Sequence, residues 1–157
     1  KLPRLRPWKS PVSMGYPDAG GELELLRSGG VENELEQVRP VLDADDVQQL
    51  QRAVDRVHVA EPLLAYLHDV VEATRHHPTL DLGVSTRGSL AWHRAARALA
   101  LVRGREYVVP DDLQHTAEMV LAHRVLLAEA LPHDGWERSH RERAVIQELM
   151  ERVAVPR

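Results

Sequence analysis

The chain contains no cysteine, no phenylalanine and no long run of apolar residues. Without cysteine it can form neither disulfides nor thiolate metal sites, so an intracellular setting is permitted. No apolar stretch approaches the roughly 18 residues that span a bilayer, and the N-terminal residues lack the apolar centre of a signal peptide. We therefore expect a soluble, cytoplasmic protein without a membrane span.

A surplus of positive charge is also missing, since the formal net charge is −4 at pH 7. This balance provides no general attraction to nucleic acid or to anionic membranes. The sequence G-x-x-x-x-G-K-[ST] is absent as well, and with it the backbone cradle and the lysine that hold the β- and γ-phosphates in P-loop enzymes. We therefore expect neither nucleic acid as a partner nor unaided ATP hydrolysis by this chain.

The scarcity of aromatic residues indicates how the core is built. Phenylalanine is absent and Trp and Tyr number three each, so the core has to come from Leu, Val and Ala. Alanine and leucine lead the helix-propensity scale, and alanine at contact positions lets helix axes approach closely. The composition of these 157 residues thus predicts an all-α protein with one small helical bundle.

Three segments differ in their pattern. Residues 1–21 hold four prolines and three glycines, so we interpret residues 1–40 as an irregular arm or linker, with a short helix at residues 22–27. Residues 41–132 show helical periodicity and are predicted to form the bundle. Residues 133–157 are predicted to form a separate C-terminal helix.

Apolar residues at spacings of three and four predict five helices after residue 40. The first begins after the capping residue Asp43, the second runs from residue 61 to residue 75, the third from 85 to 103, the fourth begins at Pro110, and the fifth runs from 137 to 153. Residues 57–59 and 107–109 are expected to be extended, and residues 79–83 to form a loop. The buried face of the third helix is predicted to contain Leu90, Ala91, Ala95, Ala98, Leu99 and Val102. The corresponding faces of the other helices are predicted to contain Val47, Leu50, Val54 and Val57 for the first, Leu63, Leu67, Val70, Val71 and Thr74 for the second, Leu113, Ala117, Val120, Leu121 and Arg124 for the fourth, and Val145, Ile146, Leu149 and Met150 for the fifth.

One arginine stands at the start of the third helix. Ser85 can cap this helix, and Arg87 then lies in its first turn. A helix N-terminus leaves backbone N–H groups unpaired and carries the positive end of the peptide dipole, so it favours phosphate. We therefore interpret Arg87 and Ser85 as candidate nucleotide-binding residues. The alternative is an ordinary surface arginine.

The sequence contains no set of residues with the spacing of a known catalytic or metal site. Nine histidines occur, but there is no H-E-x-x-H pair and no carboxylate at a ligand-like offset from two of them. Ser89 and His93 lie one helical turn apart without an evident orienting acid. We therefore predict no catalytic residue and no metal ligand.

Four further arginines and two tryptophans have two interpretations each. The four arginines are Arg94, Arg97, Arg103 and Arg105. They either form a basic face toward nucleotide or a neighbouring subunit, or they are solvated or paired with local acids. Trp92 and Trp136 are predicted to be packing anchors, with a subunit interface as the alternative.

Residues 82–126, LGVSTRGSLAWHRAARALALVRGREYVVPDDLQHTAEMVLAHRVL, resemble the C-terminal helical lid of MoxR-family AAA+ ATPases. The similarity extends backward through residues 42–78, and Met14-Gly15-Tyr16-Pro17 resembles the end of that family's nucleotide-binding core. The order of G-V-S-x-R, A-A-R-A-L-A, R-G-R-x-Y-V-x-P-D-D and H-R-V-L makes the resemblance specific.

The resemblance implies a role for single residues. Arg87 matches the sensor-2 arginine, which contacts the γ-phosphate of ATP. The chain departs from the family at Thr86, where proline is common, and at Gly88, where alanine is common, and both changes are expected to loosen the helix start. His123-Arg124 matches a dipeptide common in the family. With Arg94 it is a possible interface with the core or with a neighbouring subunit, or simply a polar helix end.

The resemblance also implies partners and cofactors. The intact protein would be an ATPase that uses ATP and Mg²⁺, bound mainly by its own P-loop core domain. It would form a homo-oligomeric ring and act in a chaperone-like way on partner proteins, with a von Willebrand factor A domain protein as a possible partner. Two alternatives stay open: a nucleotide-independent helical scaffold or adaptor, and a helical DNA-binding domain, against which the net charge counts.

Overall fold

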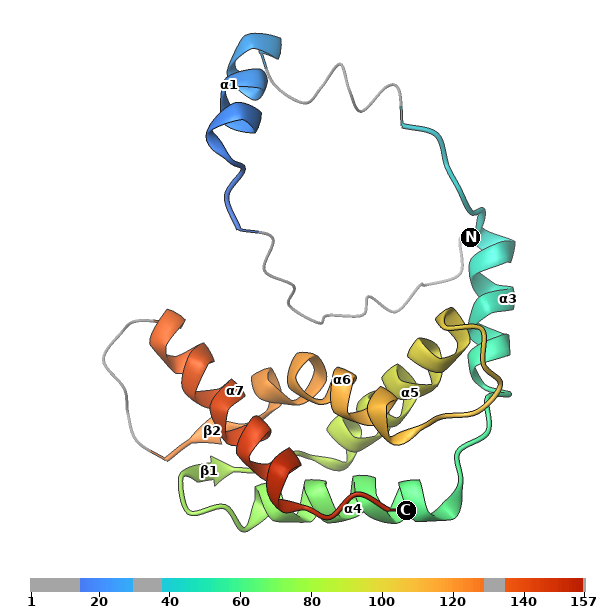
Figure 1. The fold of residues 1–157 in the computed structure, drawn as a ribbon, viewed down its shortest axis with the longest axis vertical. Helices are drawn as coiled ribbons and strands as arrows, with labels where there is room; N and C mark the ends of the chain where they lie inside the picture. The colour runs from blue at the N-terminus through green and yellow to red at the C-terminus, as the bar shows by residue number, and fades with distance from the viewer. Residues whose placement is uncertain (1–14, 30–37, 129–134, 157) are drawn as a thin grey trace. The chain divides into compact units, whose positions relative to one another are not determined.

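Helices make up most of the chain in the computed structural model, which describes residues 15–29, 38–128 and 135–156 (Figure 1). The predicted all-α class is confirmed, with a small two-stranded sheet as an addition within these ranges. Residues 12–50 belong to one compact unit and residues 51–157 to another. The predicted domain boundaries at residues 40 and 132 stay a prediction.

In the first unit, helix α1 (Ala19–Ser28) is bounded by local capping groups. The Asp18 carboxylate accepts a hydrogen bond from the Gly21 N–H at 2.7 Å, which explains why the helix begins before residue 22. Gly29 ends the helix with a φ of 72°, in the left-handed region that favours glycine. No residue of α1 is buried.

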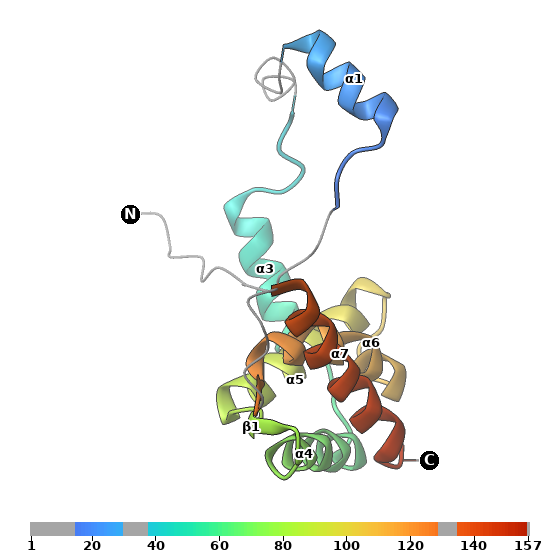
Figure 2. The same ribbon diagram turned by 90° about the vertical axis from the view of Figure 1, so that its left-hand side faces the viewer.

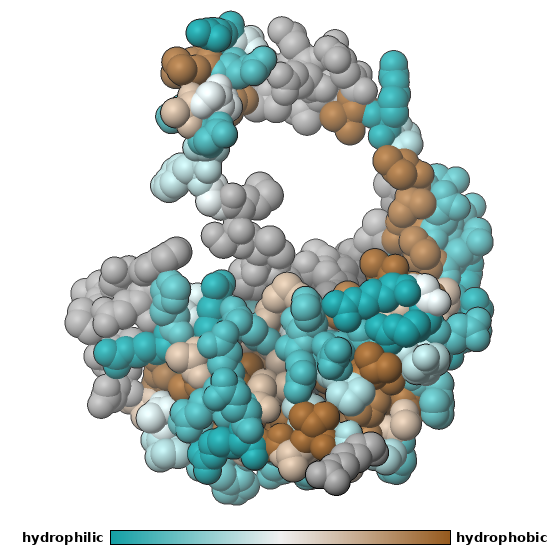
Figure 3. All heavy atoms as spheres, in the orientation of Figure 1, coloured by the Kyte–Doolittle hydropathy of each residue, from teal (hydrophilic) through white to brown (hydrophobic). Residues whose placement is uncertain are grey.

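Helix α3 (Ala44–Val54) begins where the sequence predicts. Asp43 accepts hydrogen bonds from the N–H groups of Asp45 and Asp46, both at 2.8 Å. Of the apolar face expected here, Val57 is buried but lies after the helix end, Val47 and Val54 are half-buried, and Leu50 is 46% exposed. Further exposed apolar side chains precede the helix at Val38, Val41 and Leu42. Figure 3 shows several hydrophobic residues, in brown, on this part of the chain.

The second unit is a helical bundle of α4 (Glu61–Arg75), α5 (Thr86–Val102), α6 (Pro110–Leu121) and α7 (Gly135–Arg152). A short 3₁₀ helix, η1 (Ala122–Arg124), follows α6 directly. In both ribbon views α4 lies at the bottom of the bundle, and the C-terminal end of α7 reaches down to its level (Figures 1 and 2). Helix α5 packs mainly on α6, and α7 contacts α4, α6 and η1.

The buried faces predicted for the second, fourth and fifth helices are confirmed, except that Arg124 and Met150 are only half-buried. They contribute Leu63, Leu67, Val70, Val71 and Thr74 from α4, Leu113, Ala117, Val120 and Leu121 from α6, and Val145, Ile146 and Leu149 from α7. None of the helices in the described part of the chain has the length and apolar character needed to cross a bilayer.

The predicted buried face of α5 is wrong except at Ala95, which is buried; Ala91, Ala98 and Leu99 are half-buried. Leu90 is 63% exposed and Val102 is 84% exposed. The residues that are buried on this helix are Gly88, Trp92, Ala95, Ala96 and Ala100. Apolar residues occur on every side of α5, so the periodicity does not define one face. The large Trp92 side chain decides the orientation, and its Nε1–H donates to the Leu113 carbonyl at 3.0 Å, which confirms its role as a packing anchor.

The loop predicted at residues 79–83 instead contains strand β1 (Leu80–Leu82). It pairs antiparallel with β2 (Leu126–Leu127), with Leu80 opposite Leu127. The local sequence gives no signal for β1 because its partner lies far along the chain. The extended segments expected near residues 58 and 107 form an isolated parallel bridge, in which the His58 N–H donates to the Glu106 carbonyl at 2.8 Å.

Candidate functional site

The loop that leads into α5 is fixed to the last turn of α4. The N–H of Val84 donates to Thr74 Oγ1 at 2.9 Å, and the same hydroxyl donates to the Val71 carbonyl at 2.6 Å. The carbonyl of Val84 accepts from Arg75 Nε at 3.0 Å. The Val84 side chain is fully buried, so both of its backbone polar groups need these partners. The residue before the helix cap therefore cannot move independently of α4.

Two glycines allow the close packing around this loop. A Cβ atom at Gly83 would lie 2.6 Å from the Cα of Arg75, closer than side chains tolerate. A Cβ atom at Gly88 would lie 2.7 Å from Val84 Cγ1 and 3.4 Å from Arg124 Cδ. The loosening expected from glycine at position 88 is therefore not what the packing shows, because its missing side chain lets these neighbours close over the first turn of α5.

Ser85 caps α5 as the sequence predicts. Its Oγ accepts a hydrogen bond from the Gly88 N–H at 3.3 Å, and Ser89 Oγ donates to the Ser85 carbonyl at 3.2 Å. The first turn of α5 contains no acidic residue, whereas those of α1, α3, α4 and α6 do. The start of α5 thus keeps the uncompensated positive end of its helix dipole.

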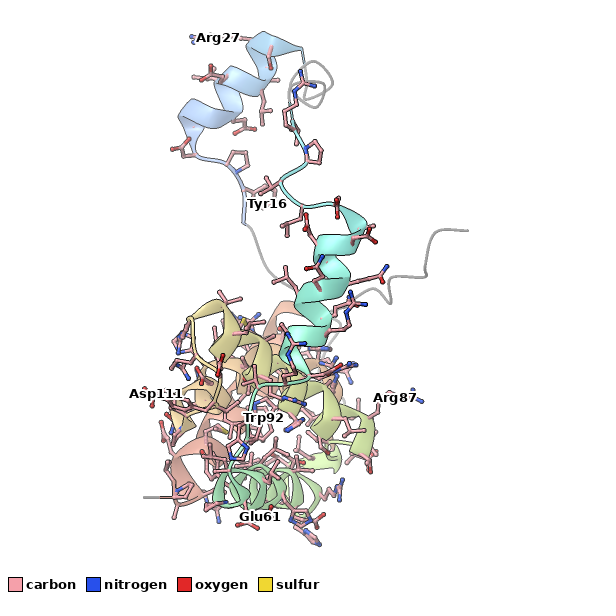
Figure 4. All side chains as sticks on the ribbon, turned by 90° about the vertical axis from the view of Figure 1, so that its right-hand side faces the viewer. Tyr16, Arg27, Glu61, Arg87, Trp92 and Asp111 are labelled. Carbon is pink, nitrogen blue, oxygen red and sulfur yellow. The ribbon has the colours of Figure 1, made fainter. Side chains whose placement is uncertain are left out.

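Arg87 is exposed at this helix start and points away from the bundle (Figure 4). Its guanidinium has no hydrogen bond or ion pair with any residue that the structure describes. Trp92, on the opposite side of the same helix, is buried in the core. The helix therefore holds Arg87 by its backbone and leaves the charged group available to a ligand.

Arg124 lies at the same end of α5, on the 3₁₀ helix η1. Its aliphatic stem passes next to Gly88, and its guanidinium donates to the Val120 carbonyl and contacts Nε2 of the exposed His123. Burial lowers the pKa of the Arg124 guanidinium. Of the residues predicted as an interface, the structure thus brings Arg124 to the turn that carries Arg87.

Arg94 is on the same face of α5 but farther along the helix. It follows Arg87 by seven residues, about 10 Å along the axis at 1.5 Å per residue. Its side chain is exposed and forms an ion pair with Asp55 at 3.3 Å. Arg97 donates to the carbonyls of Val57, at 2.9 Å, and Asp55. Arg94 is thus paired with a local acid and Arg97 with backbone carbonyls, while the interface role of Arg94 stays a prediction.

Arg103 and Arg105 are paired as well, with the fully buried Asp112. The Asp112 carboxylate lies 3.1 Å from Arg103 and 2.6 Å from Arg105, and it accepts the Val109 N–H at 2.9 Å. Burial alone would raise the pKa of Asp112, but these hydrogen bonds and charges outweigh it and lower the pKa. This cluster joins the end of α5 to the start of α6 and therefore has a structural role.

The remaining candidates bring no second site together. Within residues 15–29, 38–128 and 135–156, no group of three His, Asp or Glu side chains is arranged to hold a metal ion. Burial, with the nearby Arg97 charge, lowers the pKa of His93. The side chain of Trp136 lies outside the described residues. Sequence reasoning missed Arg75 and Gly83, because their contacts join segments that no local pattern connects.

Comparisons with known proteins agree on one family. The AAA lid domain family matches residues 72–149. The chain is 38% identical to protein YeaC of Bacillus subtilis and 33% identical to chaperone MoxR1 of Mycobacterium tuberculosis, with 92% of the chain covered in each case. A crystal structure of a putative ATPase from Cytophaga hutchinsonii matches with a TM-score of 0.73 at 26% identity, and covers 92% of this chain.

The chain spans less than half the length of these relatives, 44% of YeaC, 39% of MoxR1 and 45% of the solved ATPase chain. The matched residues 72–149 include the last turn of α4, the start of α5 and most of α7. They therefore contain Arg87, Ser85, Thr74, Arg75 and Arg124. Residues 72–149 form an AAA lid domain, and the chain belongs to the MoxR-type AAA+ ATPases.

Proposed function

We propose that this lid senses ATP through Arg87, which contacts the γ-phosphate of a nucleotide bound by a separate P-loop core. The observation that supports this most directly is an exposed arginine without a protein partner in the described ranges, on a helix start that is fixed to α4. An unpaired surface arginine on a mobile loop would provide charge without direction. Here two hydrogen bonds, between Val84 and Thr74 and between Val84 and Arg75, hold the backbone close to Arg87, and we call this pair of bonds the clamp.

The chemistry of this end of α5 suits a phosphate. A guanidinium stays charged at any physiological pH, and its planar donors match phosphate oxygens. No carboxylate stands in the first turn of α5 to compete for Arg87 or to repel an anion. Of this chain, Arg87 and the exposed Ser85 would contact the nucleotide. The core would provide most of the binding to ATP and Mg²⁺. The Mg²⁺ would neutralise part of the charge on the phosphates.

The clamp also explains how phosphate contact can change the position of the lid. Because Val84 is hydrogen-bonded to Thr74 and Arg75, a displacement of Arg87 on phosphate binding would move α4 and α5 together. We propose that the intact ATPase forms a homo-oligomeric ring in the cytoplasm. There it would use this movement for chaperone-like action on partner proteins, a von Willebrand factor A domain protein among them. The name of the relative MoxR1 supports the chaperone-like part.

The test is an ATP titration of an ATPase that contains this lid and its P-loop core, followed by turnover and by oligomer size. We expect Arg87→Ala to lower kcat about 10- to 100-fold, because a hydrogen bond to a charged group is worth about 1.5–3 kcal/mol. Arg87→Lys should recover part of the loss, since lysine keeps the charge without the planar fork. Arg152→Ala, at an exposed arginine on α7, is the matched control and should leave turnover within about twofold.

Unchanged turnover in Arg87→Ala would remove this arginine from the mechanism. The lid would then be a nucleotide-independent scaffold, and oligomer size would show whether it still packs the ring. A variant that loses helical content would not test the proposal, so circular dichroism has to show a wild-type fold first. Arg87 is exposed and without a partner in the described ranges, so we expect that fold to be kept.

A further inference from the structure

We propose that Arg124 is a positioning residue for Arg87. The aliphatic stem of Arg124 covers Gly88 and holds the first turn of α5 in place. This inference rests on the proposed function. It assigns to Arg124 an action inside the lid, through the helix start, in place of a contact with another domain or subunit.

The first turn of α5 is held on two sides by different segments. On the side of α4, the hydrogen bonds of Val84 with Thr74 and Arg75 hold the turn. At Gly88, the nearest atoms within 4 Å of a Cβ position are Val84 Cγ1, Arg124 Cδ and Ser85 Oγ. Val84 and Ser85 belong to the loop and the cap of the same turn. Arg124 thus provides the nearest contact at Gly88 from another segment of the chain.

Arg124 is itself held in a fixed place. Its guanidinium donates to the Val120 carbonyl in the last turn of α6, a group that the helix leaves without an internal partner. The residues after Arg124 lead into β2, which pairs with β1, and β1 leads into Gly83. The two segments that meet at Gly88 and Arg124 are therefore also joined at the small sheet.

This arrangement uses the two parts of Arg124 differently. The stem covers Gly88, one residue after Arg87, while the guanidinium is committed to Val120 and His123. A guanidinium held in this way is poorly placed to take a phosphate. The stem can keep the turn from shifting, because a Cβ position at Gly88 lies only 3.4 Å from Arg124 Cδ and 2.7 Å from Val84 Cγ1, so the packing leaves little free space there. The proposal therefore predicts that the stem matters more than the charge.

A double-mutant cycle in an ATPase that contains this lid and its core tests the proposal, with kcat as the readout. We expect Arg124→Ala to lower kcat about 3- to 30-fold when Arg87 is present, and by less than about twofold in the Arg87→Ala background. Arg124→Met keeps a stem of similar length without the charge, and should keep kcat within about threefold of wild type.

The outcomes separate the two proposals. Equal losses from Arg124→Ala in both backgrounds would show that Arg124 does not act through Arg87, and would overturn the positioning role while leaving the sensor role of Arg87 intact. Arg124→Met as slow as Arg124→Ala would also overturn it, because the stem would then be insufficient. If Arg87→Ala itself leaves turnover unchanged, the proposed function fails and the positioning role fails with it. Arg124→Met also keeps the test valid if Arg124→Ala does not fold.

Discussion

Replacing Thr74 by valine isolates the clamp beneath the start of α5. Thr74 is fully buried, and its hydroxyl accepts the Val84 N–H at 2.9 Å while donating to the Val71 carbonyl. Valine has the same shape but no acceptor, so the buried Val84 N–H loses its partner. An unsatisfied buried donor costs about 1–3 kcal/mol, and we expect this loss in the free energy of unfolding.

Thr116→Val is the matched control, because Thr116 is also buried, at 4% exposure. Its hydroxyl only donates to the carbonyls of Asp112 and Leu113 within α6, which keep their helical hydrogen bonds. We expect this variant to lose less than about 1 kcal/mol. Urea unfolding of the 157-residue chain, followed by circular dichroism, measures both values. The reasoning is refuted if the two variants have the same stability, or if hydrogen exchange at the Val84 amide is as slow in Thr74→Val as in wild type.

Four further substitutions test the packing and the charges. Leu121→Ala should lower stability by about 2–5 kcal/mol because Leu121 is fully buried, while Leu90→Ala at a 63% exposed position should change it by less than about 0.5 kcal/mol; similar values in thermal unfolding would show that the assigned buried faces are wrong. Gly88→Ala should destabilise by at least about 1 kcal/mol despite the better helix propensity of alanine, because its Cβ meets Val84; a higher melting temperature would contradict this. Asp112→Asn should lose about 1–3 kcal/mol at neutral pH, and the difference from wild type should shrink below about pH 4, because the lowered pKa of Asp112 stabilises the fold only while its carboxylate is charged. A difference that is independent of pH would refute this account of Asp112.

The sequence predicts the helices well where their apolar residues lie on one side. In α4, Leu63, Leu67 and Val70 repeat at helical spacing, and all three are buried. Capping residues likewise act within a few positions of themselves, so Ser85 at the start of α5 could be identified from local pattern. The position of Arg87 in the first turn follows from that cap.

Local pattern fails where packing between distant segments decides. In α5, Leu90 and Trp92 are both apolar, and only the site opposite Leu113 explains why Trp92 is the buried one. Propensity alone suggests that Gly88 weakens the helix, yet its missing side chain makes room for Val84. The stem of Arg124 reaches this turn from η1, a segment far from Gly88 in the sequence, which no spacing in the sequence indicates.

The central claim is that Arg87 detects the γ-phosphate, and a comparison of ATP with ADP tests it most directly. The measurement is the affinity of an ATPase containing this lid and its core for ADP and for a non-hydrolysable ATP analogue, with and without Arg87→Ala. We predict that the substitution weakens binding of the analogue about 10- to 100-fold and leaves ADP affinity within about twofold. Equal effects on both nucleotides, or no effect on either, would contradict the account.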